Sequence, residues 1–233
     1  MEQFITPQNL MYVARILAFL TAIPVHEAAH AFVSDKLGDH TARNAGRLTL
    51  NPIKHIDPFG FLSMLLIGVG WAKPVPVNAN YYKNRKGGMA LTAVAGPLSN
   101  LALALVMVLI WKLFYNIAAL ALGDWPLWAG AVSTVLYYLA MINVTLALFN
   151  LIPIPPLDGS RILGLVLPEK LYFGVMKYER YIMIVLLAVL FLLPYLTGFS
   201  PISWLLSGVT GAILDFFDTI TSFVDWIFLR IRL

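Results

Sequence analysis

The chain has 233 residues, of which 60% are hydrophobic and 12% are charged, and its mean hydropathy is +0.79. Soluble domains are about 45–50% apolar and about 25% charged, so this composition excludes an ordinary soluble enzyme, a disordered chain and a fibrous repeat. It predicts an integral membrane protein, in which lipid covers the apolar surface that a soluble fold would have to bury. The chain has no Cys, which excludes disulfides, thiolate nucleophiles and Cys-ligated metals.

The net charge of +4 is that of a mildly basic protein. In a membrane protein a basic excess sets orientation, so we expect no nucleic-acid partner. The N-terminal residues contain neither a basic n-region nor a small-residue cleavage site. We therefore expect no removable signal peptide.

The first apolar segment, residues 10–33, is long enough to cross a membrane but carries Arg15, His26, Glu27 and His30. Ionisable side chains inside a membrane are costly in free energy and usually mark a functional site. This segment is therefore the first candidate for chemistry.

A mixed region follows at 34–86, with turn residues and two strand-like runs at 47–50 and 71–77. The two runs predict a small membrane-associated β-hairpin, whose second strand contains two prolines and therefore lies at an edge. Between them, residues 59–69 are apolar but too short to cross, which predicts a re-entrant or interfacial segment.

Three uncharged stretches, at 87–111, 125–157 and 181–214, complete the predicted membrane helices. The fold class is therefore an all-α polytopic membrane protein with about 4–6 membrane helices. Residues 1–233 are predicted to form a single membrane-embedded domain. Within it, residues 199–233 are expected to be a helix peripheral to the catalytic core.

Acidic and polar residues recur at helical spacing near the C-terminus, opposite an aromatic and aliphatic face. They are Asp215, Asp218, Ser222 and Asp225. This pattern favours an amphipathic helix at the membrane surface over a further membrane helix, because a span would bring three acids into the bilayer. The sequence itself offers no role for this acidic stripe.

The distribution of Lys and Arg among the loops predicts how the chain is oriented across the membrane. Residues 36–86 contain eight Lys or Arg and two Asp, and the next basic group, within 161–180, follows two spans later on the same side. Because basic loops stay in the cytoplasm, the N-terminus is expected outside a prokaryotic cell membrane. The active site is then expected toward the cytoplasmic face.

The motif HEAAH places His26, Glu27 and His30 in the pattern HExxH. Helical residues four apart share a face with Cβ atoms about 5–6 Å apart, so both imidazoles can reach one Zn²⁺ at about 2.0–2.1 Å. Glu27 projects about 100° further around the helix, beside the metal, where it can take a proton from water. Two incidental histidines on a membrane helix would be the alternative, at a cost of several kcal/mol.

A catalytic zinc site needs a third protein ligand and an open position. His40 and His55 lie in the basic loop, and a carboxylate would serve as well. Asp158 is the best carboxylate, because the prolines within 153–156 prevent a regular helix and predict an unwound segment lining a cavity. From spacing alone, Asp158 could equally be the N-cap of a following helix.

Five blocks occur in order along residues 10–180, namely HEAAH, GRLTLNPIKHIDPFG, WAKPVPVN, AGPLSN and FNLIPIPPLDGSRIL. Together they resemble the site-2 protease family of intramembrane zinc metalloproteases, and in particular its small prokaryotic members without PDZ or CBS domains. The resemblance implies one Zn²⁺ per chain, with His26 and His30 as ligands, Asp158 as the third ligand and Glu27 as the base. It also implies that Asn150 holds substrate or the oxyanion near the metal.

Asn100 matches a polar family position in the neighbouring helix, for which an interhelical hydrogen bond is the structural alternative. The preceding Gly96-Pro97 predicts a kink or a point of close packing.

The predicted function is hydrolysis of peptide bonds within or near transmembrane segments of membrane proteins, as in regulated intramembrane proteolysis. The expected partners are a substrate with a transmembrane segment and the lipid bilayer. A helical substrate must unwind before attack, and the runs at 47–50 and 71–77 could capture the unwound strand by β-augmentation. A non-catalytic zinc-binding protein and a metal-ion transporter are the alternatives, and the absence of charge from 87–111, 125–157 and 181–214 argues against a transporter.

Overall fold

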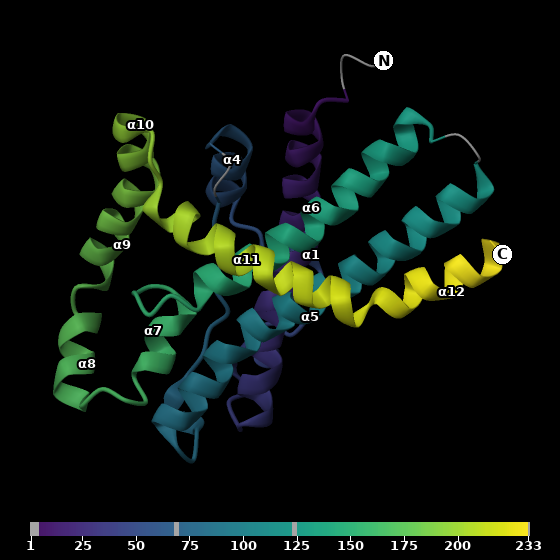
Figure 1. Cartoon of the computed structure of the whole chain (residues 1–233). Coiled ribbons are helices and arrows are strands. Elements are labelled where there is room, and N and C mark those ends of the chain that lie inside the picture. The colour runs from purple at the N-terminus through teal and green to yellow at the C-terminus, as the bar shows by residue number, and fades with distance from the viewer. Residues whose placement is uncertain (1–4, 68–69, 123–124, 233) are drawn as a thin grey trace.

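A computed structural model of the chain describes residues 5–67, 70–122 and 125–232 (Figure 1). Its elements in chain order are α1 (Pro7–Lys36), α2 (Thr41–Asn44), α3 (Pro52–His55), α4 (Pro58–Ile67), η2 (Ala79–Tyr81), α5 (Arg85–Ala121), α6 (Leu127–Asn150), α7 (Asp158–Leu163), α8 (Glu169–Met176), α9 (Glu179–Leu187), η3 (Ala188–Leu192), α10 (Leu193–Thr197), α11 (Pro201–Ile220) and α12 (Ser222–Arg232).

Four helices of the described residues are long and apolar enough to cross a membrane, namely Pro7–Lys36, Arg85–Ala121, Leu127–Asn150 and Glu179–Thr197. They lie on the four predicted apolar segments, which confirms the all-α polytopic class. The last predicted stretch, at 181–214, is divided. Gly198 adopts a left-handed conformation with φ of 70°, and Ser200 caps a new helix, so the chain turns into α11.

Helices α1, α5 and α6 pack against one another and form the centre of the molecule. Their contact faces are rich in small residues, which let helix backbones approach closely where lipid provides no hydrophobic drive for association. The buried alanines include Ala18 and Ala22 of α1, Ala93 and Ala104 of α5, and Ala140 of α6. The tight packing fixes the position of α1, which carries HExxH, against α5.

The predicted β-hairpin is not present as regular strands. Within the described part of the chain, strand pairing is limited to one isolated antiparallel bridge between Ile56 and Ala72. Pro74 and Pro76 lack N–H groups, and the Lys73 carbonyl accepts a hydrogen bond from the Arg47 side chain at 2.5 Å. The extended run at 71–77 is therefore tied to other parts of the loop, which leaves it no continuous ladder.

The apolar segment at 59–69 forms the ten-residue helix α4, and residues 68–69 lie outside the described residues. The chain then returns alongside the start of α4, where the Gly60 backbone lies against Trp71 so closely that a Cβ at Gly60 would overlap the Trp71 carbonyl. Phe61 packs on Phe19 of α1, with ring centroids 5.2 Å apart. Entry of this helix into the bilayer stays a prediction.

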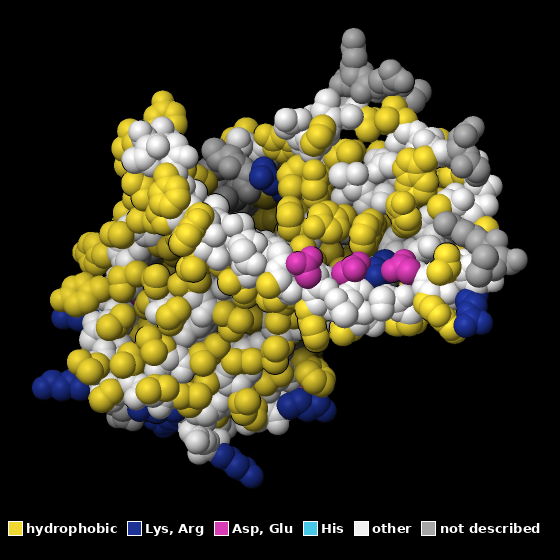
Figure 2. Space-filling view, viewed as in Figure 1, with side chains coloured by type: hydrophobic (Ala, Val, Ile, Leu, Met, Phe, Trp, Pro, Cys, Tyr) yellow, Lys and Arg dark blue, Asp and Glu magenta, His cyan; other side chains and the backbone are white. Residues whose placement is uncertain are grey.

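The acidic stripe near the C-terminus faces a buried lysine of α5. Lys112, of which 4% of the side chain is exposed, lies 2.7 Å from Asp225 and 3.0 Å from Asp218. Asn116, one turn further along α5, donates to the other Asp225 oxygen at 2.8 Å. Figure 2 shows these acidic side chains around a basic one where α11 and α12 cross the front of the molecule. The stripe therefore neutralises a cation that would otherwise be buried without a partner.

Neither α11 nor α12 is among the four candidate spans. Helix α11 packs on α6, where Thr210 and Thr145 hydroxyls lie 3.4 Å apart, and its first turns line the cavity described below. The division of residues 199–233 from the catalytic core stays a prediction.

We predict that Lys112→Ala lowers the free energy of unfolding by about 1–2 kcal/mol, because it leaves two carboxylates without their cation. Both carboxylates are about half exposed, which keeps the loss below that of a fully buried pair. A double-mutant cycle with Asp225→Ala, measured by thermal unfolding in detergent, gives the coupling. Asp215→Asn in α11 is the control, since Asp215 is exposed. A coupling near zero between Lys112 and Asp225 would contradict the prediction.

Candidate metal centre

The two histidines of HExxH lie on one face of α1 and are both buried. Their Nε2 atoms are 3.0 Å apart, and the two rings meet edge to face with centroids separated by 4.5 Å. Pro24 lies two residues before His26 within the same continuous helix. The four-residue spacing therefore brings two ring nitrogens to one point, as the sequence predicts.

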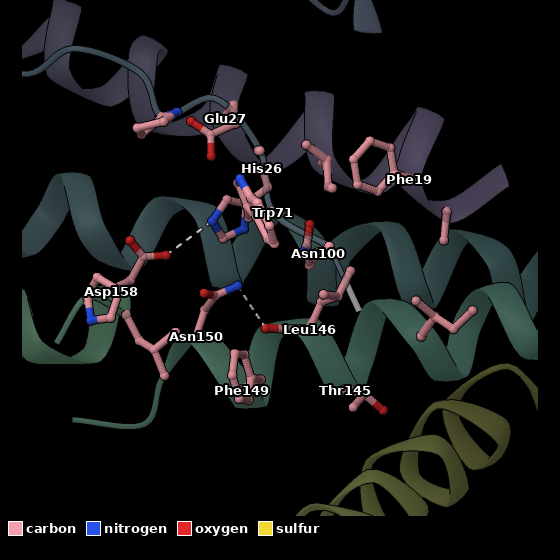
Figure 3. A pocket seen from close by; sticks show the side chains of 18 of the residues that line it. Phe19, His26, Glu27, Trp71, Asn100, Thr145, Leu146, Phe149, Asn150 and Asp158 are labelled. Carbon is pink, nitrogen blue, oxygen red and sulfur yellow. Dashed lines mark hydrogen bonds and ion pairs between the residues drawn. The ribbon is translucent and has the colours of Figure 1, made fainter. Parts of the chain in front are cut away.

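Asp158 reaches the same point from a segment that lies far along the chain from α1. Helix α6 ends at Asn150, and a non-helical segment rich in proline leads to α7, which begins at Asp158. The Asp158 Oδ2 atom lies 3.1 Å from His26 Nε2 and 3.3 Å from His30 Nε2 (Figure 3). Three ligand atoms bound tetrahedrally at about 2.0–2.1 Å are about 3.3 Å apart, so the three atoms have the spacing of a zinc site.

Hydrogen bonding sets the ring nitrogen that each histidine offers. His30 Nδ1 lies 2.7 Å from the Thr92 carbonyl, which can only accept, so Nδ1 carries the proton and Nε2 keeps a lone pair. His26 Nδ1 and Asp158 Oδ2 are buried and lack hydrogen-bond partners among the described residues. The lone pair of His30 Nε2, the carboxylate oxygen of Asp158 and the Nε2 atom of His26 converge on one point and fit a divalent cation, which would satisfy the buried Asp158 oxygen.

The candidates for the third ligand have different surroundings in the structure. The N-cap of α7 is Leu157, no side-chain cap bond is present, and Asp158 is the first helical residue, so the capping alternative is wrong. His40 is 2.7 Å from Asp35, and His55 is fully buried with its Nε2 2.8 Å from the Thr49 carbonyl. Both histidines thus stabilise the loop and lie outside the cluster of ligand atoms.

Glu27 is buried beside the histidines and held by the loop. Its Oε2 accepts a hydrogen bond of 2.9 Å from the Val75 N–H. Val75 lies between Pro74 and Pro76, neither of which has an N–H group, so it provides the single backbone donor of this tripeptide. The extended run at 71–77 therefore positions the glutamate, which sequence reasoning did not predict.

The cluster opens into a cavity of about 970 Å³ bounded by α1, α5, α6, α11 and the run at 71–77. Asn150 points toward the metal ligands from the end of α6, and its Nδ2 donates to the Leu146 carbonyl at 3.1 Å (Figure 3). Asn100 lines the cavity from α5 and is 1% exposed, and its Oδ1 has no hydrogen-bond partner among the described residues. The cavity thus collects both asparagines that the sequence singled out.

Gly96 is a point of close packing, as the sequence suggested. A Cβ atom placed there would lie 2.5 Å from His26 Cε1 and 2.5 Å from His30 Nε2. Only glycine leaves room for both rings between α1 and α5. The closeness of Gly96 to the two histidines cannot be read from either sequence motif alone, because the motifs lie on different helices.

A chain of hydrogen bonds connects this site with the loop after α1. The Tyr82 hydroxyl lies 3.0 Å from Thr92 Oγ1 and 2.8 Å from Ser34 Oγ, which in turn donates to Asp39 at 2.9 Å. Burial alone would raise the pKa of the Asp39 carboxyl, but its hydrogen bonds, led by that from the Asn78 N–H, lower the pKa below its ordinary value. Asp39 is therefore an anion that orders the loop.

The chain was compared with known proteins. The model of peptidase family M50 matches residues 111–193. "Putative zinc metalloprotease YwhC" of Bacillus subtilis is 40% identical over 181 residues, which are 77% of this chain and 80% of the relative. "Putative zinc metalloprotease Rip2" of Mycobacterium tuberculosis H37Rv is 33% identical over 210 residues, 86% of this chain and 76% of the relative.

The chain belongs to peptidase family M50, the site-2 protease family. A third M50 relative, "Putative zinc metalloprotease MJ0611" of Methanocaldococcus jannaschii, is 29% identical over 156 residues, 66% of this chain and 71% of the relative. No solved structure matches the chain at a significant level. The segment that matches the M50 model, residues 111–193, contains Asn150 and Asp158 and does not include HExxH. Together with the apolar helices, membership establishes an M50 membrane protein.

We predict that Gly96→Ala lowers metal occupancy at least about tenfold, because the added methyl group displaces the histidine rings from their shared point. Metal content per chain after purification is the measurement. Gly208→Ala in α11 is the matched control, since a Cβ there meets nothing within 4 Å. Full metal occupancy in Gly96→Ala would show that α5 can move away from α1.

Proposed function

We propose that this protein is an intramembrane zinc metalloprotease that hydrolyses peptide bonds within or near transmembrane segments of membrane proteins, as in regulated intramembrane proteolysis. The observation that carries the proposal is the convergence of His26 Nε2, His30 Nε2 and Asp158 Oδ2 within 3.3 Å of one another. Glu27 is the adjacent residue in the same helix. The names of the M50 relatives as zinc metalloproteases support the choice of metal and reaction.

His26, His30 and Asp158 would hold one Zn²⁺ per chain, with a fourth position left for water or substrate. When bound, Zn²⁺ supplies a Lewis acid that acidifies water and stabilises negative charge on a peptide carbonyl. The donor set of two neutral imidazoles and one carboxylate is the set used by several hydrolytic zinc enzymes. His26 and His30 are buried and Asp158 is half-buried, which limits the access of competing water to the site.

Glu27 acts as the general base and then as the general acid. Its carboxylate takes a proton from the water that attacks the peptide carbonyl carbon, and it later gives that proton to the nitrogen of the leaving amine as the C–N bond breaks. The Val75 N–H donates to Glu27 Oε2, which limits rotation of the Glu27 side chain. Oε1 is then free to accept and donate the proton. The loop thereby orients the base.

The asparagines bind the substrate. One N–H of the Asn150 amide is used by the Leu146 carbonyl, and the second is available to the developing oxyanion. Asn100 offers its unpartnered Oδ1 to an N–H of the unwound substrate, since a buried carbonyl without a donor gains a hydrogen bond on binding.

The site lies within the membrane but nearer one face. From His30 to the end of α1 at Lys36 is about 9 Å of helix, and the basic loop follows. With the basic loop in the cytoplasm, the N-terminus lies outside and cleavage takes place near the cytoplasmic side. A substrate helix must unwind to expose its carbonyls, and the run at 71–77 along the cavity is the candidate for pairing with the unwound strand.

We predict that Glu27→Gln retains one Zn²⁺ per chain and lowers the cleavage rate by about 10²–10⁴-fold, because the amide cannot accept the proton. Asp158→Asn should instead lower zinc occupancy. The measurements are metal analysis and cleavage of a membrane-spanning substrate in proteoliposomes. His40→Ala is the control, since His40 lies outside the cluster.

Each alternative has its own outcome in this experiment. Zinc binding without any cleavage by the unaltered protein would indicate a non-catalytic zinc protein, and zinc uptake into the vesicles would indicate a transporter. Cleavage that survives Glu27→Gln would contradict its role as the base.

We predict that Val75→Pro lowers kcat about tenfold or more while zinc occupancy is retained, because proline removes the N–H that holds Glu27. Val75→Ala keeps the N–H and is the matched control. Single-turnover cleavage under saturating substrate measures the effect. Equal rates for Val75→Pro and Val75→Ala would show that the base needs no support from the loop.

A further inference from the structure

Arg15 lies on the same face of α1 as the metal ligands. His26 follows Arg15 by eleven positions, which is close to three helical turns. The two side chains are therefore displaced by about 16 Å along the helix axis and by about 20° around it. The cavity that contains the candidate metal site is also lined by Arg15, Phe19 and Ile23, together with His26. The cavity therefore runs along α1 from the metal ligands to an arginine.

The two cations that line this cavity have different surroundings. Arg161 lies 3.7 Å from Glu179. Arg15 stacks on the Tyr12 ring, with its guanidinium carbon 5.7 Å from the centroid, and forms no ion pair with a carboxylate of the described residues. A guanidinium inside a membrane segment is costly unless an anion or water compensates its charge. Arg15 thus has binding capacity that the chain itself does not use.

We propose that Arg15 is a specificity-determining residue that binds a carboxylate carried by the transmembrane segment of the substrate. The inference rests on the proposed function, since it concerns the substrate of the same site. A guanidinium binds a carboxylate through two parallel N–H···O hydrogen bonds, which gives direction as well as charge neutralisation. An acidic side chain in an otherwise apolar substrate segment then neutralises Arg15 while the scissile bond lies at the metal ligands.

The separation along α1 predicts where this carboxylate lies in the substrate. An extended chain covers about 16 Å in about five residues, and a helix covers it in about eleven. Because the substrate is extended at the scissile bond and helical beyond it, the acid is expected about five to eleven residues away. It lies on the side of the scissile bond that is nearer the N-terminal end of α1.

The placement of Arg15 favours a substrate group over a lipid headgroup. The lipid-facing side of α1 is marked by the exposed apolar residues Val13, Leu17 and Leu20. Arg15 is instead half-buried and shares the cavity with the ligands of the candidate metal site. An anion that enters this cavity together with the scissile bond is therefore expected to be part of the substrate.

The experiment uses the full chain with zinc in phosphatidylcholine vesicles. The substrate is a synthetic single-span Leu/Ala peptide with one central Gly-rich stretch, whose cleavage site is mapped by mass spectrometry. One Asp is placed in turn at about two to about twelve residues from the scissile bond, on either side. We expect kcat/KM to rise about tenfold over that of the neutral peptide only within the predicted window and on the predicted side.

Variants of Arg15 test the pairing. Arg15→Gln should reduce the ratio of kcat/KM for the Asp peptide and the neutral peptide to about one, and Arg15→Lys should retain part of it. Arg15→Glu should reverse the preference in favour of a Lys peptide, which a merely structural role would not do. The position scan uses the unaltered protein, so it is informative even where a variant fails to fold.

Three outcomes would overturn the inference. Cleavage of all peptides by the unaltered protein without dependence on the acid would overturn it and leave the proposed function intact. Acceleration by added phosphatidylglycerol, with no effect of the substrate acid, would assign Arg15 to a lipid headgroup. Failure to cleave any peptide would contradict the proposed function, and the inference about Arg15 would then be wrong as well.

Discussion

Leaving an ionisable group unpaired in apolar surroundings costs free energy, and the structure of this protein depends on pairing such groups. Several buried polar side chains of this protein have a partner from a distant part of the chain. The Thr92 carbonyl orders His30, and the Val75 N–H holds Glu27. Lys112 of α5 is neutralised by Asp218 and Asp225, more than a hundred residues away in sequence. Asp158 Oδ2 and Asn100 Oδ1, which lack hydrogen-bond partners among the described residues, lie at the candidate metal site and along its cavity.

Close helix packing brings the partners together. Small residues on α1, α5 and α6 allow their backbones to approach, and Gly96 leaves space for the two histidine rings. The same closeness puts the Thr92 carbonyl in reach of His30. The small size of these alanine and glycine residues sets the distance between α1 and α5. The geometry of the candidate metal centre therefore depends on residues that take no part in metal binding or catalysis.

Much of the candidate site could be predicted from the sequence. The predictions that the structure does not reproduce concern the loop between α1 and α5. Local spacing determines HExxH, since four residues make one helical turn, and the prolines before Asp158 break the helix as expected. The predicted β-hairpin is not present as regular strands in the described part of the chain. Residues 48–49 form a bend, and the run at 71–77 bonds to side chains and to a neighbouring turn. His40 and His55 were reasonable ligands in sequence, but each has its own partner in the loop.

The amino-acid sequence by itself determined the membrane class, the apolar segments, HExxH and the candidacy of Asp158, because hydropathy and helical periodicity act over neighbouring residues. Only the tertiary structure decided that Asp158 meets the histidines, that Val75 holds Glu27, that the acidic stripe pairs with Lys112, and that Arg15 shares the cavity. Each of these depends on residues that lie far apart in the chain. Their distances are set by how the helices pack, and no local pattern records them.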